Sequence, residues 1–214
     1  MISVSEALDR LKEGNRRFVS GVGGRSAGVT QADRSELVER QEPFAAVIGC
    51  SDSRVPPEIV FDQGLGDLFV IRVAGNVAGP SQIGSVEFAV ASLGVRLVVV
   101  LGHSSCGAIR ATLETLAEPE KAQSKPLFRS PNLGSIVDCI RPSVETLRTR
   151  EALRGPDGAG DYESLLRQAV RANVRAAVHT LRERSEIIEK FIQEEGLQVV
   201  GAEYSLETGV VEFF

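Results

Sequence analysis

Three short apolar runs without polar alternation constrain the fold more than any other feature of this chain. They span residues 44–49, 68–73 and 97–101. Strands that are apolar on both faces are typical of a parallel sheet covered by helices. Residues 82–93, between the second and third runs, have apolar side chains at helical spacing. We therefore expect an α/β fold with a central, mainly parallel β-sheet flanked by helices and joined by right-handed crossovers.

The flanking segments are predominantly helical. Ser5 is a candidate N-cap for a helix that ends near Phe18. Further helices are predicted over residues 33–40, 106–116, 133–150 and 161–195. The last of these is too long for one surface helix, so we expect a bend near Arg184 or Ser185. Strands over residues 197–202 and 210–214 should close the chain around a turn at 207–209. These segments divide into an N-terminal helical arm, residues 1–40, and an α/β domain with a helical C-terminal half, residues 41–214.

Composition and charge limit the kinds of molecule that this chain is expected to bind. A chain of 214 residues suits one α/β domain with extensions. The formal net charge of −5 and the lack of a basic face with interleaved aromatic residues argue against nucleic acid. The longest apolar run, residues 97–102, is far shorter than the roughly 18 residues of a membrane span. Residues 1–18 lack the apolar middle region of a signal peptide. We expect a cytoplasmic protein that binds neither nucleic acid nor membrane.

Two motifs follow the first and third apolar runs. The first is Cys50-Ser-Asp52-Ser-Arg54, and the second is His103-Ser-Ser-Cys106. The carboxyl ends of parallel strands meet at one edge of a sheet, so Cys50, His103 and Cys106 should converge. Two thiolates and an imidazole suit zinc, and three protein ligands leave a fourth position for water. Each motif by itself could be a turn with a local ion pair, or a redox or structural cysteine; their joint placement favours zinc.

The residues around these ligands fit the same interpretation. Asp52 could enter or leave the fourth position, and Arg54 could hold its carboxylate by a bidentate ion pair. Cys106 opens a predicted helix, whose dipole favours the thiolate. Cys139, the remaining cysteine, is predicted to be a small buried residue, and an unpaired cysteine suits a reducing compartment. His179 is predicted to be a partly exposed helix residue.

Five stretches of this chain resemble the β-class carbonic anhydrases. They are CSDSRVPPE (50–58), FDQGLGDLF (61–69), IRVAGN (71–76), GSVEFAV (84–90) and GHSSCGA (102–108). The resemblance implies a lyase that hydrates carbon dioxide reversibly to bicarbonate and a proton through zinc-bound hydroxide. It implies one Zn²⁺ per subunit, bound by Cys50, His103 and Cys106. Asp52 of the Asp52–Arg54 pair would accept a hydrogen bond from the hydroxide or, in a closed state, become the fourth ligand.

The resemblance also implies a substrate pocket and an assembly. Phe69, Ala74 and Phe88 match apolar pocket positions, and the backbone amide of Gly107 matches a donor to substrate. Core packing is the alternative role for Phe69 and Phe88. Gln41 matches a pocket glutamine that would reach the active site of the partner subunit. We expect a homodimer or a dimer of dimers, with the arm of residues 1–40 packed on the partner because it has no obvious site on its own sheet.

The sequence departs from some members of the family at one position, and two other functions are possible for the same site. Some bacterial members place a tryptophan three residues before the first cysteine, in an inhibitory bicarbonate pocket; here Val47 stands there, and the chain has no tryptophan. Arg72 matches the arginine of that pocket, with a structural role as the alternative. The rivals are a hydrolase for carbonyl sulfide or carbon disulfide, and a zinc-stabilised regulatory protein with Asp52 as a permanent fourth ligand. The intact Asp52–Arg54 pair and Gln41 argue against the regulatory protein.

Overall fold

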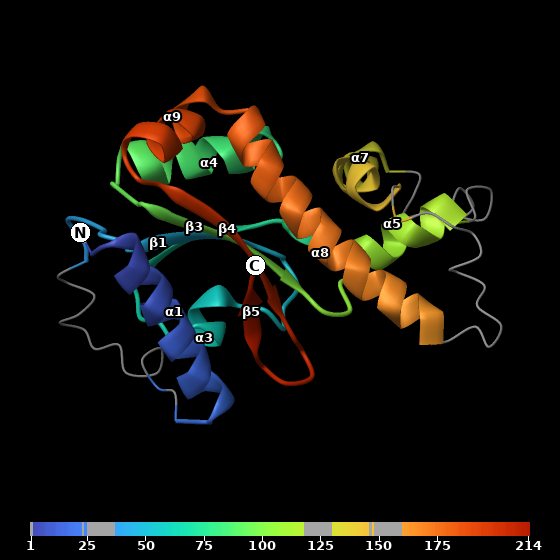
Figure 1. Ribbon diagram of the computed structural model, residues 1–214, viewed down its shortest axis with the longest axis horizontal. Helices are drawn as coiled ribbons and strands as arrows, with labels where there is room; N and C mark the ends of the chain where they lie inside the picture. Colours follow the sequence, from blue (N-terminus) through green and yellow to red (C-terminus); the bar gives the residue numbers. More distant parts are fainter. Residues whose placement is uncertain (1, 23, 25–36, 118–129, 146, 148–159) are drawn as a thin grey trace.

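The computed structural model describes residues 2–22, 24, 37–117, 130–145, 147 and 160–214. Its elements follow the predicted order, with strands separated by helices (Figure 1). They are α1 (Val4–Val19), β1 (Ala45–Gly49), α3 (Pro57–Val60), β2 (Leu68–Arg72), the 3₁₀ turn η1 (Ala74–Asn76), α4 (Pro80–Ala91), β3 (Leu97–His103), α5 (Gly107–Ala117), α7 (Pro131–Glu145), α8 (Gly160–Glu183), α9 (Glu186–Glu194), β4 (Gln198–Tyr204) and β5 (Val211–Phe213).

In the described part of the chain the strands form one five-stranded sheet in the order β2-β1-β3-β4-β5. The first four strands are parallel, and only β5 runs antiparallel to its neighbour β4. Every residue of β1 and β3 is buried, which explains why neither strand alternates in sequence. The prediction of a central, mainly parallel sheet flanked by helices is confirmed. In this register Gly49, the last residue of β1, lies beside Leu101 of β3, and β3 continues two residues further to His103.

Helices cover both faces of the sheet (Figure 1). On one face α4, α8 and α9 pack through Val86, Leu181 and Ile188 against Ile48 and Val100. On the other face α1 and α3 close a second cluster around the opposite side chains of the same strands, with Val47 and Val99 among them. Alternate residues of a strand point to opposite faces, so each central strand contributes to both cores.

A third buried cluster lies at the carboxyl end of the sheet. It joins α5, α7 and the first half of α8, through residues such as Ile109, Ile140 and Leu166, with Cys50 and Cys106. Figure 1 shows α5 and α7 beside the sheet rather than over its faces. The helical C-terminal half therefore encloses the ends of β1 and β3, where the two sequence motifs lie.

Several boundaries differ from the predictions. The cap of α1 is Ser3, because Ser3 and Glu6 form a reciprocal capping box that Ser5 cannot form. Of the helix predicted over 33–40, residues 33–36 lie outside the described residues and 37–40 are not helical. The bend near Arg184 or Ser185 is confirmed: α8 ends at Glu183, and Ser185 caps α9. Among the described helices, none is both long and apolar enough to span a bilayer.

Two further expectations need correction. The premise that the arm has no site on its own sheet is wrong, because Ala7 and Leu11 of α1 are buried in the cluster that contains Val47. Contact between the arm and a partner stays a prediction. Cys139 is exposed rather than buried. Helical spacing turns Val137 and Ile140 of α7 into the core and places Cys139 off that face.

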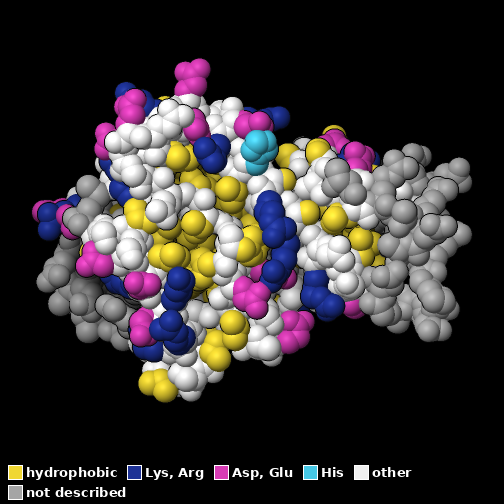
Figure 2. All heavy atoms as spheres, viewed as in Figure 1, with side chains coloured by type: hydrophobic (Ala, Val, Ile, Leu, Met, Phe, Trp, Pro, Cys, Tyr) yellow, Lys and Arg dark blue, Asp and Glu magenta, His cyan; other side chains and the backbone are white. Residues whose placement is uncertain are grey.

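The outer face of the C-terminal hairpin leaves apolar atoms at the surface. Figure 2 shows apolar side chains gathered beside β4 and the C-terminus. Val210 and Phe214, which flank β5, are among the large apolar residues that are exposed. An apolar surface of this kind is typical of a protein–protein contact.

Candidate metal centre

The carboxyl ends of β1 and β3 bring three potential ligands together. Cys50 follows β1, His103 is the last residue of β3, and Cys106 precedes α5. Their ligand atoms lie within 4.8 Å of one another, and all three residues are buried. Ser105 adopts a left-handed conformation with φ of 55°, which reverses the chain between His103 and Cys106. Within the described residues, this cluster has the composition and geometry to hold a metal ion.

The imidazole of His103 has its metal-facing nitrogen free. Nδ1 lies 2.8 Å from the backbone oxygen of Ser104. A carbonyl oxygen only accepts hydrogen bonds, so Nδ1 carries the proton and Nε2 has a lone pair. Nε2 is buried and has no hydrogen-bond partner among the described residues. A buried polar atom without a partner is costly, and coordination to a metal would satisfy it.

The two thiols favour a cation between them. A hydrogen bond with Cys106 is the main cause of a lowered pKa at Cys50, with further contributions from the backbone amides of Asp52 and Gly75. The adjacent Cys50 sulfur and burial raise the pKa of Cys106. One thiolate therefore forms readily, whereas a second beside it would be an uncompensated buried charge. A divalent cation removes that penalty, so the donor set fits zinc.

Asp52 and Arg54 form the predicted bidentate pair. Arg54 Nε donates to Asp52 Oδ1 at 2.9 Å, and Arg54 Nη2 donates to Oδ2 at 2.8 Å. These bonds lower the pKa of Asp52, so its carboxylate is ionised at neutral pH. Asp52 Oδ2 lies 3.9 Å from His103 Nε2, beside the ligand cluster. Because the Arg54 side chain is 55% exposed, the pair contributes little to folding and mainly orients the carboxylate.

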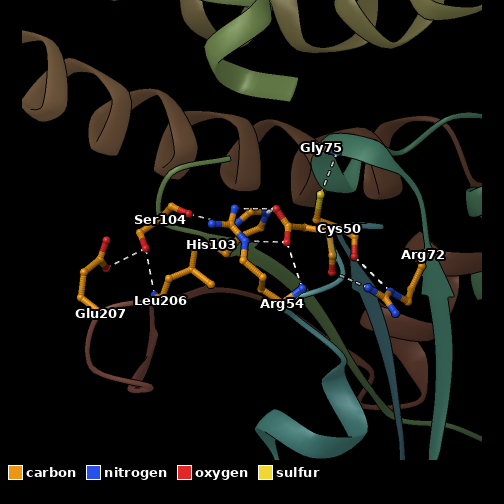
Figure 3. A network of polar contacts seen from close by, with 9 residues as sticks. Cys50, Arg54, Arg72, Gly75, His103, Ser104, Leu206 and Glu207 are labelled. Carbon is orange, nitrogen blue, oxygen red and sulfur yellow. Dashed lines mark hydrogen bonds and ion pairs between the residues drawn. The ribbon is translucent and has the colours of Figure 1, made fainter. Parts of the chain in front are cut away.

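Arg72 binds the backbone of the first motif. Its Nε donates to the carbonyl oxygen of Cys50 at 3.1 Å, and its Nη2 donates to that of Asp52 at 2.6 Å (Figure 3). Arg72 is the last residue of β2 and pairs with Gly49 of β1. The guanidinium therefore spans from the neighbouring strand to both carbonyls and holds the turn after β1. These contacts favour the structural role that was the alternative for this residue.

A second group of contacts was not predicted from the sequence. The amide of Gly75 donates to Cys50 Sγ at 3.3 Å, and Asn173 Nδ2 in turn donates to the Gly75 oxygen at 2.8 Å. Gly75 has φ of +71°, and a Cβ there would lie 2.8 Å from Ile140 Cδ1. On the other side, Ser104 binds Glu207. Only the fold reveals these links, because no motif or spacing connects residues about one hundred positions apart.

The residues predicted to line the substrate pocket differ in their burial and in the elements that carry them. Phe69 on β2 packs against a core cluster, and its ring centroid lies 6.1 Å from that of Phe88 on α4. Phe88 is 49% exposed, so core packing does not account for it. Ala74 opens η1 beside Gly75. Gly107 opens α5, where a first-turn amide has no partner inside the helix.

Gln41 and His179 lie away from the three ligands. Gln41 is exposed and precedes β1, whereas Cys50 follows that strand, so the full length of β1 separates them. A role for Gln41 in the active site of a partner subunit stays a prediction. The side chain of His179 is 69% exposed on α8 and pairs with Glu183 at 3.0 Å. The prediction of an exposed helix residue is confirmed for His179.

Comparisons with known proteins agree with this geometry. A family model described as carbonic anhydrase matches residues 45–211. The carbonic anhydrase of Mycolicibacterium smegmatis is 41% identical over 207 residues, which cover 96% of this chain and 91% of that protein. Carbonic anhydrase 2 of Mycobacterium tuberculosis is 39% identical over 205 residues, which cover 95% of this chain and 89% of that protein.

Comparison with solved structures shows that the fold of this chain is also similar to that of known proteins. A tetrameric β-carbonic anhydrase from Sordaria macrospora superposes with a TM-score of 0.66 and 27% identity, over 85% of each chain. The family match spans both motifs and most of the described sheet. From the matched sequence, the shared fold and the buried Cys/His/Cys cluster we conclude that this chain belongs to the β-class carbonic anhydrases, a family of lyases.

Proposed function

We propose that this protein catalyses the reversible hydration of carbon dioxide to bicarbonate and a proton, with one zinc ion per subunit held by Cys50, His103 and Cys106. The observation that carries this proposal is the buried ligand cluster, in which His103 Nε2 has no partner among the described residues and the Asp52 carboxylate lies alongside. When bound, zinc would supply the Lewis acidity that makes water nucleophilic near neutral pH.

The surrounding residues supply orientation. Asp52 is ionised and held by Arg54, so its Oδ2 can accept a hydrogen bond from a water at the centre and fix that water's direction. We propose that Phe69, Ala74 and Phe88 form an apolar wall that suits carbon dioxide, and that the Gly107 amide donates to a substrate oxygen. The exposure of Phe88 is consistent with a pocket that a partner subunit completes.

Assembly belongs to the same proposal. We propose a homodimer or a dimer of dimers in the cytoplasm, in which Gln41 reaches the centre of the partner subunit and the arm of residues 1–40 contacts the partner. The apolar surface beside β4 and β5 is a candidate for one contact between subunits. The related Sordaria macrospora enzyme is described as tetrameric.

The rival functions make different demands on the site. A zinc-stabilised regulatory protein would use Asp52 as a permanent ligand, but Arg54 binds both oxygens of that carboxylate here. A hydrolase for carbonyl sulfide or carbon disulfide would use the same centre. Rates measured on carbon dioxide and on carbonyl sulfide with one preparation distinguish that enzyme from a carbonic anhydrase.

The test exploits the third cysteine as a matched control. Cys106→Ser replaces a buried candidate ligand with a hydroxyl, which binds zinc poorly. Cys139→Ser makes the same change at an exposed position of α7. We expect Cys106→Ser to lose most bound zinc and nearly all hydration in a stopped-flow assay, and Cys139→Ser to keep both. Equal zinc content and activity in the two variants would exclude the ligand assignment.

A further inference from the structure

Ser104, the residue after His103, is buried, and its hydroxyl, amide and carbonyl groups all form hydrogen bonds. Its hydroxyl donates to Glu207 Oε2 at 2.8 Å and accepts from the amide of Leu206 at 2.9 Å (Figure 3). Its own amide donates to the oxygen of Tyr204 at 2.9 Å. Its carbonyl accepts from His103 Nδ1 at 2.8 Å. Ser104 therefore joins the imidazole of a candidate ligand to the β4–β5 turn.

The partner of Ser104 in that turn is held in place. The turn closes through the amide of Gly209, which donates to the Ser205 oxygen at 2.8 Å. Glu207 Oε2 also accepts from the Ser205 hydroxyl at 3.0 Å. The hydrogen bond from Ser104 is the largest cause of a lowered pKa at Glu207, so this acceptor is ionised at neutral pH.

The turn is also anchored to α1. The buried Asn15 donates from Nδ2 to the Gly209 oxygen at 2.9 Å, and its Oδ1 accepts from the amide of Val211 at 2.9 Å. These two bonds hold the β5 side of the turn against a core helix, and β4 runs directly into its other side, so the turn resists displacement more than a free hairpin loop. Glu207 itself is exposed, but the backbone that carries it is anchored, so its carboxylate stays within reach of Ser104.

We propose that Glu207 is a positioning residue for His103 and acts through Ser104. The proposal rests on the proposed metal at the Cys50–His103–Cys106 centre. The direction of the Ser104 carbonyl sets the ring plane of His103 and keeps the proton on Nδ1, which leaves Nε2 for the metal. Bonds to the amide and hydroxyl of Ser104 hold that carbonyl in place, and Glu207 is the charged partner among them.

The conformation of the next residue explains why this attachment is needed. Ser105 has φ of 55°, a left-handed conformation that costs energy for a residue with a side chain. Such a conformation persists only when its neighbours are held, and Ser104 is the neighbour on the strand side. Without Glu207, the peptide between Ser104 and Ser105 gains freedom to rotate, and the carbonyl that orients His103 rotates with it.

The experiment compares three variants of the full-length protein. Glu207→Ala removes the acceptor, Glu207→Gln keeps a neutral one, and Thr208→Ala alters the same turn without touching the link. The first readout is the zinc dissociation constant, measured by competition with a chelator. The second is the visible absorption spectrum of the Co²⁺-loaded protein, which reports the geometry of the ligands.

We expect zinc affinity to fall roughly tenfold in Glu207→Ala, the lower end of the range for groups that hold a metal ligand. The cobalt spectrum should change with it. Glu207→Gln should stay within about threefold of the wild type, because a neutral oxygen still accepts from Ser104. Thr208→Ala should match the wild type. Wild-type affinity and spectrum in Glu207→Ala would overturn the proposal.

A variant of Ser104 tests the same hydrogen bond from the Ser104 side. Ser104→Ala should weaken zinc binding at least as much as Glu207→Ala, and the double variant should lose no more than the larger single change. Additive losses would mean that the two residues act independently and would overturn the proposal. If Glu207→Ala folds poorly, the zinc affinity of Ser104→Ala still tests the link. If the wild-type protein itself binds no zinc, the proposed function fails; if it binds zinc and the variants match it, only the role of Glu207 fails.

Discussion

One candidate ligand sulfur and the imidazole each form a hydrogen bond with a backbone group. Cys50 Sγ accepts from the Gly75 amide, and His103 Nδ1 donates to the Ser104 carbonyl. Arg72 binds the carbonyls on either side of Ser51. Hydrogen bonds of this kind orient ligands before a metal arrives, so less conformational freedom is lost on binding.

Replacing Asp52 tests its role in turnover apart from metal binding. Asp52→Ala should keep zinc, because the three candidate ligands remain. Hydration should fall by roughly two orders of magnitude, within the range for a positioned acid–base group. Stopped-flow rates with metal analysis check this, and Asp138→Ala, at an exposed aspartate of α7, is the matched control. An unchanged rate in Asp52→Ala would limit the Asp52–Arg54 pair to a structural role.

At the scale of elements, α8 supports the candidate metal centre through a buried side chain. It carries Asn173, which is buried and donates to the oxygen of Gly75. The 3₁₀ turn η1 holds Gly75 in the left-handed region, where a Cβ would collide with Ile140. A helix from the C-terminal half thus fixes the backbone that donates to Cys50.

Removing the Asn173 side chain should destabilise the protein. Asn173→Ala leaves a buried carbonyl oxygen without that donor, so the free energy of unfolding should fall by about 1–3 kcal/mol. Denaturant unfolding measures the change. Asn132→Ala, at an exposed asparagine of α7, should change stability by less than about 0.5 kcal/mol. If the two variants unfold at the same denaturant concentration, the contact between Asn173 and Gly75 contributes nothing.

The capping box of α1 predicts a contribution to folding stability that depends on pH. Backbone and side-chain hydrogen bonds from Ser3 lower the pKa of Glu6 below its ordinary value of 4.5. A carboxyl whose pKa is lower in the folded state stabilises that state above the unfolded pKa, and the effect is lost as pH falls through the folded pKa. Glu6→Ala should therefore destabilise the protein near neutral pH and have less effect at about pH 3.

Unfolding measured at both pH values tests this prediction. Glu13→Ala, on the same helix but outside the cap, is the control. A destabilisation of Glu6→Ala that is equally large at both pH values would show that the carboxylate charge plays no part.

At the scale of the whole molecule, the hydrophobic cores on the two sheet faces do not include the candidate metal centre. Cys50 and Cys106 belong to the third cluster, whereas the two clusters on the sheet faces contain no candidate ligand. Metal loss should therefore leave the sheet folded and loosen only the surroundings of α5 and α7.

Chelation tests this division. Dialysis against a strong zinc chelator should abolish hydration while the far-ultraviolet circular dichroism is retained. Zn²⁺ should restore activity and Mg²⁺ should not, because thiolates select soft or borderline ions. Simultaneous loss of fold and activity would instead favour a metal with a structural role.

Mixed dimers test the role proposed for Gln41. A Gln41→Ala subunit paired with a Cys50→Ser subunit should recover one working centre if Gln41 acts across the interface, because the intact ligands then meet the partner's intact glutamine. Each variant by itself should have low activity. Separately tagged subunits, purified as the heterodimer, allow the measurement, and no recovered activity would contradict the cross-subunit role.

The sheet and the convergence of Cys50, His103 and Cys106 could be predicted because both depend on local patterns. Unalternating runs at 44–49 and 97–101 require burial on both faces, and motifs that directly follow parallel strands must share one edge. The same reasoning failed for Cys139, since one position decides which side of a helix a residue faces. It also misplaced the packing of α1, since the pairing of an amphipathic helix with a particular sheet face is a long-range property.

Local sequence patterns were sufficient to predict the layered α/β architecture and the convergence of Cys50, His103 and Cys106. Only the three-dimensional contacts reveal which residues support these candidate ligands. Asn173, Glu207 and Asn15 are polar residues in ordinary helices and turns, and no neighbour in sequence distinguishes them. Their roles arise because hydrogen bonds depend on distance in space: Asn173 lies 2.8 Å from the Gly75 oxygen, Glu207 lies 2.8 Å from the Ser104 hydroxyl, and Asn15 lies 2.9 Å from the Gly209 oxygen.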